Sequence, residues 1–250
     1  MCHDDDSRAP APPVRGEVAG HGEVELTSAD GTRFAAYEAR PAAPRPDRAG
    51  VVLLPDVRGL HPYYRDLAVR FAEAGLPAVA IDYFGRTAGT GPRGDDFEFR
   101  PHVDRVEHGN VEQDVAAAID RLREPAGGGA GPVFTVGFCF GGSRSWRLSA
   151  SGLDLAGVVG FYGKPALVRD VVGRMRHPLL LLVAGADQAT PQQDFTDFDR
   201  QLTDAGVPHE MNVYPGAPHS FFDRSYAEWK DAGADAWRRI LAFVDRLAAG

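Results

Sequence analysis

Short apolar runs separated by polar segments predict the strands of the sheet. The run GVVLLP at residues 50–55 is β-branched and apolar on both faces, as a buried parallel strand requires. Similar runs predict strands at 78–82, 133–137, 157–162, 179–185 and 209–215. The pair Asp30-Gly31 lies between two alternating segments and predicts a hairpin ahead of the first buried strand.

Apolar residues at helical spacing fill the intervals between these strands. They predict helices near 62–74, 111–123, 191–205 and 227–248, and a further helix after residue 139. Strands that alternate with helices after an opening hairpin indicate an α/β protein. We expect a mostly parallel central sheet of about eight strands with helices on both faces.

The first 20 residues differ in composition from the rest of the chain. Pro, Asp and Gly dominate there, and little apolar surface is available for packing. We therefore expect a flexible N-terminal arm over residues 1–20. No internal repeat or linker divides the remainder, so residues 21–250 are expected to form a single domain.

Composition and charge exclude some classes of function for this protein. The chain has 250 residues, of which 44% are hydrophobic, enough to bury a sizeable core, and a net charge of -8 that argues against a nucleic-acid partner. No segment approaches the roughly 20 apolar residues that cross a bilayer, and no secretion signal is recognised at the start. We expect a cytoplasmic protein without a membrane partner, as a monomer or a small homo-oligomer.

Only two cysteines occur, and they are not expected to pair. Cys2 lies in a polar tail, whereas Cys139 follows a predicted strand. No histidine pair has the spacing of a zinc site, so neither a metal nor another cofactor is expected. The chemistry of Cys139 therefore depends on its protein neighbours.

The segment GFCFGG at residues 137–142 fits the nucleophile-elbow pattern G-x-nucleophile-x-G. Glycines on both sides let the backbone cross closely at a sharp strand-to-helix turn. The positive end of the following helix favours a thiolate at Cys139. The alternative is that Cys139 is a small buried hydrophobic residue, but the glycines favour a nucleophile.

Candidate partners follow other predicted strands. Asp56 and Arg58 come after residues 50–55, Asp187 after 179–185 and His219 after 209–215. The carboxyl ends of parallel strands meet at one edge of a sheet, where ligands bind. The order nucleophile, acid, histidine is that of α/β-hydrolases. Asp187 could instead be a turn or helix-capping residue, and His219 a surface histidine.

These residues resemble one family. GFCFGG, the AGAD that ends at Asp187 and the PHSFF around His219 are similar to the dienelactone hydrolase (carboxymethylenebutenolidase) family of α/β-hydrolases. The resemblance extends over about residues 22–248. It implies an α/β-hydrolase fold and hydrolysis of an ester, typically an enol-lactone that bears a carboxylate, in the breakdown of aromatic rings. A small anionic ester or lactone is then the expected partner.

The resemblance also implies roles for individual residues. Cys139, His219 and Asp187 correspond to the catalytic triad, and the backbone N–H groups of Phe140 and Val57 to the oxyanion hole. The resemblance assigns binding of the substrate carboxylate to Arg86 in DYFGR and to Arg224. It also places Asp56 at the position of a family glutamate beside the thiol.

Several readings stay open at this point. The wall of the site is expected to include Phe84, Tyr162, Phe221 and Phe222, with aromatic core packing as the alternative. A carboxylate at Asp56 would keep the thiol protonated and protect it from oxidation until substrate binds. Other functions that the motifs allow are hydrolysis of a different small ester, transfer to an acceptor other than water, and non-catalytic binding of small acids or thiol sensing.

Overall fold

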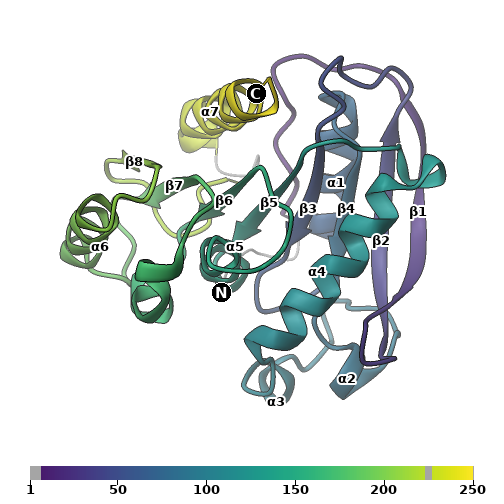
Figure 1. The fold of residues 1–250 in the computed structure, drawn as a ribbon, viewed down its shortest axis with the longest axis horizontal. Coiled ribbons are helices and arrows are strands. Elements are labelled where there is room, and N and C mark those ends of the chain that lie inside the picture. Colours follow the sequence, from purple (N-terminus) through teal and green to yellow (C-terminus); the bar gives the residue numbers. More distant parts are fainter. Residues whose placement is uncertain (1–6, 223–226, 250) are drawn as a thin grey trace.

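The central feature of the fold is an eight-stranded sheet (Figure 1). The computed structural model describes residues 7–222 and 227–249. The strands lie in the order β1-β2-β4-β3-β5-β6-β7-β8, with β2 antiparallel to both β1 and β4 and all other neighbours parallel. The bounds are β1 Val18–Thr27, β2 Arg33–Pro41, β3 Gly50–Leu54, β4 Ala78–Ile81, β5 Val133–Phe138, β6 Gly157–Phe161, β7 Leu179–Ala184 and β8 His209–Tyr214. The expected mostly parallel sheet is confirmed.

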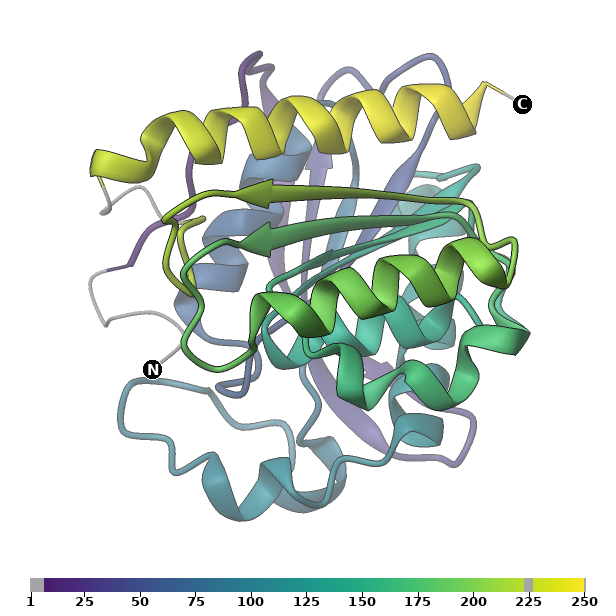
Figure 2. The ribbon, with the colours of Figure 1, turned by 90° about the vertical axis from the view of Figure 1, so that its left-hand side faces the viewer.

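Helices cover both faces of this sheet, as the alternating pattern predicted (Figures 1 and 2). The bounds are α1 Pro62–Glu73, α2 Gly85–Ala88, α3 Arg100–Val103, α4 His108–Arg123, α5 Phe140–Leu148, α6 Gln192–Asp204 and α7 Lys230–Ala248. Four short 3-10 turns join them, at Pro125–Gly127, Pro165–Leu167, Arg169–Arg174 and Ala227–Trp229. Within the described ranges, no helix is both long and apolar enough to cross a membrane.

Two hydrophobic clusters lie on opposite faces of the sheet. Successive residues of a strand point to opposite faces. Val51 and Leu53 therefore belong to the cluster that includes α1 and α7, whereas Val52 and Leu54 belong to the cluster that includes α4, α5 and α6. All five residues of β3 are buried. Continuous apolar runs are therefore required, because both faces of these strands are covered.

The parallel strands bring the polar loops to one edge. β3 and β5 to β8 run in the same direction, and the arrowheads of β7 and β8 point the same way in Figure 2. The segments that follow these strands therefore leave the sheet on the same side. This edge carries the candidate site.

Part of the described N-terminal segment contacts the helices. Ala9 is 1% exposed, and its backbone N–H donates to the Asp66 carboxylate at 3.2 Å. The Trp237 indole N–H donates to the Pro10 carbonyl at 3.1 Å. Ala9 and Pro10 of the expected arm therefore contact α1 and α7, and the flexibility of the arm stays a prediction. Strand β1 begins at Val18, inside the expected arm.

Candidate active site

Cys139 occupies the sharp turn between β5 and α5. Its backbone has φ 55° and ψ -110°, a left-handed conformation that costs energy for a residue other than glycine. A Cβ on Gly137 would lie 2.0 Å from the Gly141 carbonyl oxygen, and one on Gly141 would lie 2.1 Å from the Leu54 oxygen. The glycines are therefore required by the turn, and this geometry presents the partly exposed sulfur at the edge of the sheet.

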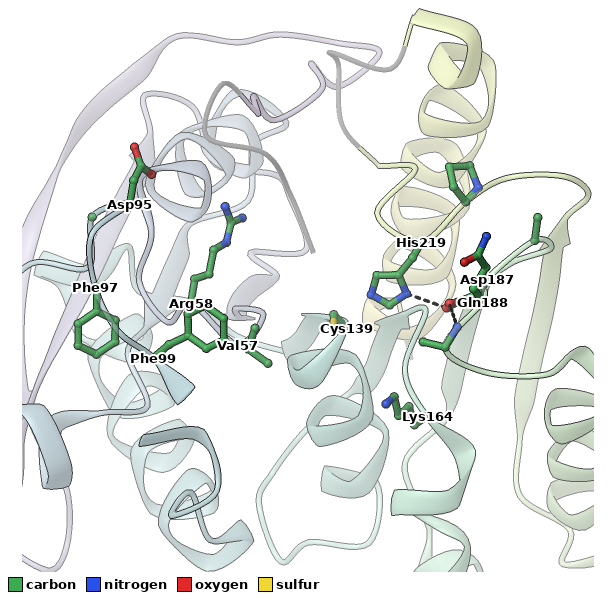
Figure 3. A pocket seen from close by; sticks show the side chains of 14 residues that line it. Val57, Arg58, Asp95, Phe97, Phe99, Cys139, Lys164, Asp187, Gln188 and His219 are labelled. Atoms are coloured by element: carbon green, nitrogen blue, oxygen red, sulfur yellow. Dashed lines mark hydrogen bonds and ion pairs between the residues drawn. The ribbon is translucent and has the colours of Figure 1, made fainter. Parts of the chain in front are cut away.

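A histidine–carboxylate pair lies beside this sulfur. The His219 Nδ1 is 2.7 Å from the Asp187 Oδ2, and Asp187 Oδ1 accepts the Ala189 backbone N–H at 2.8 Å. Asp187 is only 9% exposed. Figure 3 shows His219 between Asp187 and Cys139, with its second ring nitrogen turned toward the cysteine. The bond to Asp187 thus fixes the orientation of the imidazole.

These residues line one pocket with a volume of about 480 Å³ (Figure 3). Its wall consists of Val57, Arg58, Gly94, Asp95, Phe97, Phe99, Cys139, Lys164, Ala186, Asp187, Gln188, Ala189, Pro218 and His219. A pocket of this volume fits a small organic molecule. In residues 7–222 and 227–249, no three His, Cys, Asp or Glu side chains are grouped as metal ligands would be.

Two residues whose backbone amides are candidate oxyanion donors, Val57 and Phe140, lie at the pocket or directly after the nucleophile. Val57 lines the pocket, and Phe140 is the first residue of α5, where a helix leaves N–H groups without intrahelical acceptors. Among the described residues, neither amide has a hydrogen-bond acceptor. The role of these two N–H groups as oxyanion donors stays a prediction; preorganised N–H groups of this kind can stabilise a developing oxyanion.

Asp56 lies behind the pocket wall and is held by Arg58. The Asp56 carboxylate is 0% exposed, and the Arg58 side chain is 13% exposed. Arg58 Nη2 is 3.1 Å from Asp56 Oδ2, Arg58 Nε is 3.2 Å from Oδ1, and the Arg58 backbone N–H donates to Oδ1 at 2.8 Å. The carboxylate is therefore compensated by an arginine that itself lines the pocket.

Arg86 is not brought to the pocket. Its Nη1 is 2.9 Å from both carboxylate oxygens of Asp114, and its Nε is 2.9 Å from Asp30 Oδ2. Helix α2 lies so close to β2 that Gly85 has no room for a side chain: a Cβ there would be 2.5 Å from the Arg33 carbonyl oxygen. The guanidinium therefore ties the β1–β2 hairpin to α4 instead of facing the sulfur.

The expected aromatic wall is mostly core. Tyr162, Phe221, Phe222 and Phe84 are all 0% exposed, and none lines the pocket. The Tyr162 ring centroid lies 4.7 Å from that of His219, so this buried ring packs against the imidazole. Arg224 lies outside the described residues.

Other pocket residues were missed by sequence reasoning. Phe97, Phe99 and Asp95 come from the segment between α2 and α3, and Lys164 follows β6. No periodic pattern marks the first segment. Lys164 did carry a signal, because it stands three residues after the end of a buried parallel strand, where ligand sites form.

A buried ion pair anchors the segment that carries these phenylalanines. Arg93 Nη2 is 3.0 Å from Asp82 Oδ2, and both side chains are at most 3% exposed. Burial raises the pKa of Asp82, and Arg93 opposes that rise. The Arg93 guanidinium also lies 4.6 Å from the Phe97 ring centroid. Phe97 is thereby fixed over the pocket.

Comparison with known proteins agrees with this geometry. The protein named "Putative carboxymethylenebutenolidase" of Salmonella typhi is 29% identical over 228 residues, covering 84% of this chain and 82% of the relative. "Probable 2-oxo-3-(5-oxofuran-2-ylidene)propanoate lactonase" of a Bradyrhizobium species is 26% identical over 220 residues, covering 84% of this chain and 88% of the relative.

Structure comparison gives the same family and confirms the α/β-hydrolase fold. The crystal structure of "Putative Dienelactone Hydrolase" from Klebsiella pneumoniae matches with a TM-score of 0.70 and 28% identity, covering 90% of this chain and 98% of that one. A model of the dienelactone hydrolase family matches residues 34–248. Since this match spans most of the sequence, the chain belongs to the dienelactone hydrolase family and is a hydrolase of the ester or lactone type.

Proposed function

We propose that the protein hydrolyses a small lactone or ester that bears a carboxylate, through an acyl-enzyme on Cys139. One observation carries this proposal. The strained turn presents the sulfur to the same pocket as an imidazole that a buried carboxylate orients at 2.7 Å. That combination is the arrangement of an activated nucleophile and its base.

The proposed reaction has two stages. His219 Nε2 takes the thiol proton as sulfur attacks the carbonyl carbon, and the N–H groups of Val57 and Phe140 receive the charge on the carbonyl oxygen. The carbon–oxygen single bond of the ester then breaks, and the imidazolium protonates the departing oxygen. Water, deprotonated by the same nitrogen, attacks the thioester, and the sulfur leaves and recovers its proton. Asp187 stabilises the imidazolium in both stages.

Asp56 has a separate proposed role in the resting protein. A thiolate near the surface is prone to oxidation, and a neighbouring carboxylate disfavours a second negative charge. The proposed role of Asp56 is to limit the reactivity of the resting Cys139 sulfur, while Arg58 offsets the cost of burying the Asp56 charge. Deprotonation by His219 then accompanies attack on a bound substrate.

The proposed substrate class follows from the pocket and the relatives. Arg58 and Lys164 both line the pocket, which suits an anionic ligand. The Bradyrhizobium relative is named for a lactone that carries a carboxylate. We therefore assign the protein to small carboxylated lactones of aromatic-ring breakdown. A reducing cytoplasm would suit its thiol.

The test compares hydrolysis by the wild-type protein with that by Cys139→Ala, on an enol-lactone with a carboxylate and on a neutral aryl ester. We expect the lactone to be preferred, and the substitution to lower kcat by at least about 10³-fold on both. Cys2→Ala, at the only other cysteine in the sequence, is the control and should leave kcat unchanged. Equal hydrolysis by Cys139→Ala and wild type would leave a thiol sensor or small-acid binder as the better reading.

A further inference from the structure

Two cationic side chains, Arg58 and Lys164, line the pocket, and they differ in their pairing with carboxylates. Arg58 pairs with Asp56. The pocket carboxylates Asp95 and Asp187 lie 2.7 Å from the His61 and His219 imidazoles, which would neutralise them only when protonated. Lys164 also lines the pocket and is exposed. Among the described residues it makes no salt bridge. The Lys164 ammonium is therefore the pocket cation whose charge remains available to a ligand.

The backbone of Lys164 is fixed relative to the nucleophile. Its N–H donates to Ser143 Oγ at 2.7 Å, and Ser143 belongs to α5, the helix that starts directly after Cys139. The preceding Gly163 permits this close approach, because a Cβ there would lie 2.6 Å from the Trp146 ring. The backbone position of Lys164 is therefore fixed by packing, while the four-carbon chain that carries its ammonium can adjust to a ligand.

Lys164 and Arg58 lie on opposite sides of Cys139 (Figure 3). A substrate whose reacting carbonyl sits over the sulfur can extend toward either of them. Toward Arg58 its carboxylate must compete with Asp56, which already accepts from that guanidinium at 3.1 Å. Toward Lys164 it meets a cation without such a competitor. An anionic group therefore binds more favourably on the Lys164 side of the pocket than on the Arg58 side.

We infer that Lys164 is the specificity-determining residue that binds the substrate carboxylate, the role that resemblance alone assigned to Arg86. This inference rests on the proposed hydrolysis and names the side of the pocket that recognises the anion. An ammonium acts as a point charge with rotatable donors, so recognition depends on charge more than on planar geometry. A sulfonate should replace the carboxylate, whereas a carboxamide should not.

The test measures kcat and KM for an enol-lactone with a carboxylate and for the same lactone with a carboxamide. We expect Lys164→Met to raise KM for the carboxylate about tenfold with little change in kcat, and to leave the carboxamide unaffected. Lys164→Arg should restore most of the preference, and Lys164→Glu should reverse it. The sequence contains one other lysine, Lys230, which is exposed at the start of α7, so Lys230→Met is the matched control.

The outcomes separate this inference from the proposed hydrolysis. An unchanged ratio of kcat/KM for the two lactones in Lys164→Met would overturn the inference, and so would an equal loss on both, which indicates a structural effect. In either case, loss of carboxamide hydrolysis in Cys139→Ala would leave the proposed hydrolysis standing. Retained hydrolysis in Cys139→Ala would contradict the hydrolytic mechanism whatever the lysine does.

Discussion

Two arginine–aspartate pairs in this protein are almost identical in burial but differ in position. Asp56 and Asp114 are 0% and 1% exposed, and their partners Arg58 and Arg86 are 13% and 16% exposed. Each carboxylate accepts hydrogen bonds from its arginine on both oxygens. Arg58 lines the candidate site, whereas Arg86 joins a hairpin to a helix.

This difference shows that a charged pair cannot be assigned a role from residue type and burial alone. The Asp114–Arg86 pair has no contact with the pocket, so it is expected to contribute stability only. The Asp56–Arg58 pair adjoins the nucleophile, so each partner is expected to change the reactivity of the thiol. Substitutions at equivalent positions of the two pairs test this distinction.

Arg86→Met is expected to have the largest effect, a loss of folding stability. Removing one partner of a buried ion pair leaves an uncompensated charge and costs about 3–5 kcal/mol of unfolding free energy. We expect this loss in urea denaturation at pH 7, with kcat/KM essentially unchanged in the folded protein. A selective rise in KM for anionic lactones would instead place Arg86 in substrate binding.

A smaller effect, on catalysis, is expected from Arg58→Met. Without its guanidinium, the buried Asp56 charge is uncompensated beside the nucleophile and opposes thiolate formation. We expect kcat/KM to fall about 10- to 100-fold for charged and neutral substrates alike, and alkylation of Cys139 by iodoacetamide to slow. A variant that folds and retains the wild-type kcat/KM would remove the proposed difference between the pairs.

Asp56→Asn is expected to have the opposite effect on the reactivity of the Cys139 thiol. This substitution leaves the Arg58 cation uncompensated, which favours the thiolate. Iodoacetamide should alkylate Cys139 about three- to tenfold faster at neutral pH than in the wild type. Asp114→Asn is the matched control and should leave the alkylation rate unchanged. Fast alkylation of the wild type that Asp56→Asn does not alter would contradict the proposed protection of the thiol.

The smallest effect concerns the pH dependence of the Arg86→Met stability loss. Burial raises the pKa of Asp114 above its ordinary 3.8, and Ser28 and Arg86 oppose the rise, so the pKa rises further without Arg86. Above about pH 4, the Asp114 carboxyl is still protonated in the folded variant but ionised in the unfolded chain. The stability of the variant therefore falls as pH rises above about 4.

Asp30 contributes in a lower pH range in the wild type. Its hydrogen bond with Arg86 lowers the pKa of Asp30 to about 2, so that contribution is present above pH 3.8 and is lost as pH falls toward 2. The Asp30 contribution is constant between pH 4.5 and pH 7, so Asp114 alone should make the deficit of Arg86→Met smaller at pH 4.5 than at pH 7, measured by urea denaturation. A deficit that grows on acidification would contradict the assigned pairing.

The sequence was informative wherever a local pattern determines structure. Apolar runs located all six parallel strands to within a residue or two, and the glycines around Cys139 predicted its turn. The common edge of a parallel sheet then brought Cys139, Asp187 and His219 together.

Long-range pairing could not be predicted in this way. Arg86 stands in the expected local motif, but its side chain is directed to Asp114 and Asp30, which are distant in sequence. Phe97 reaches the pocket because Arg93 is buried against Asp82. No spacing in the sequence encodes these contacts, since each depends on how separate segments pack.

The most direct test of the central claim is the mass of the protein during turnover. Opening a lactone leaves both halves of the substrate on the enzyme, so the proposed acyl-enzyme carries the full mass of the lactone. Acid quenching within one turnover, followed by peptide mass spectrometry, should place that added mass on the peptide containing Cys139, and His219→Ala should fail to form it. Wild-type turnover without any adduct, together with equal turnover by Cys139→Ala, would contradict the account.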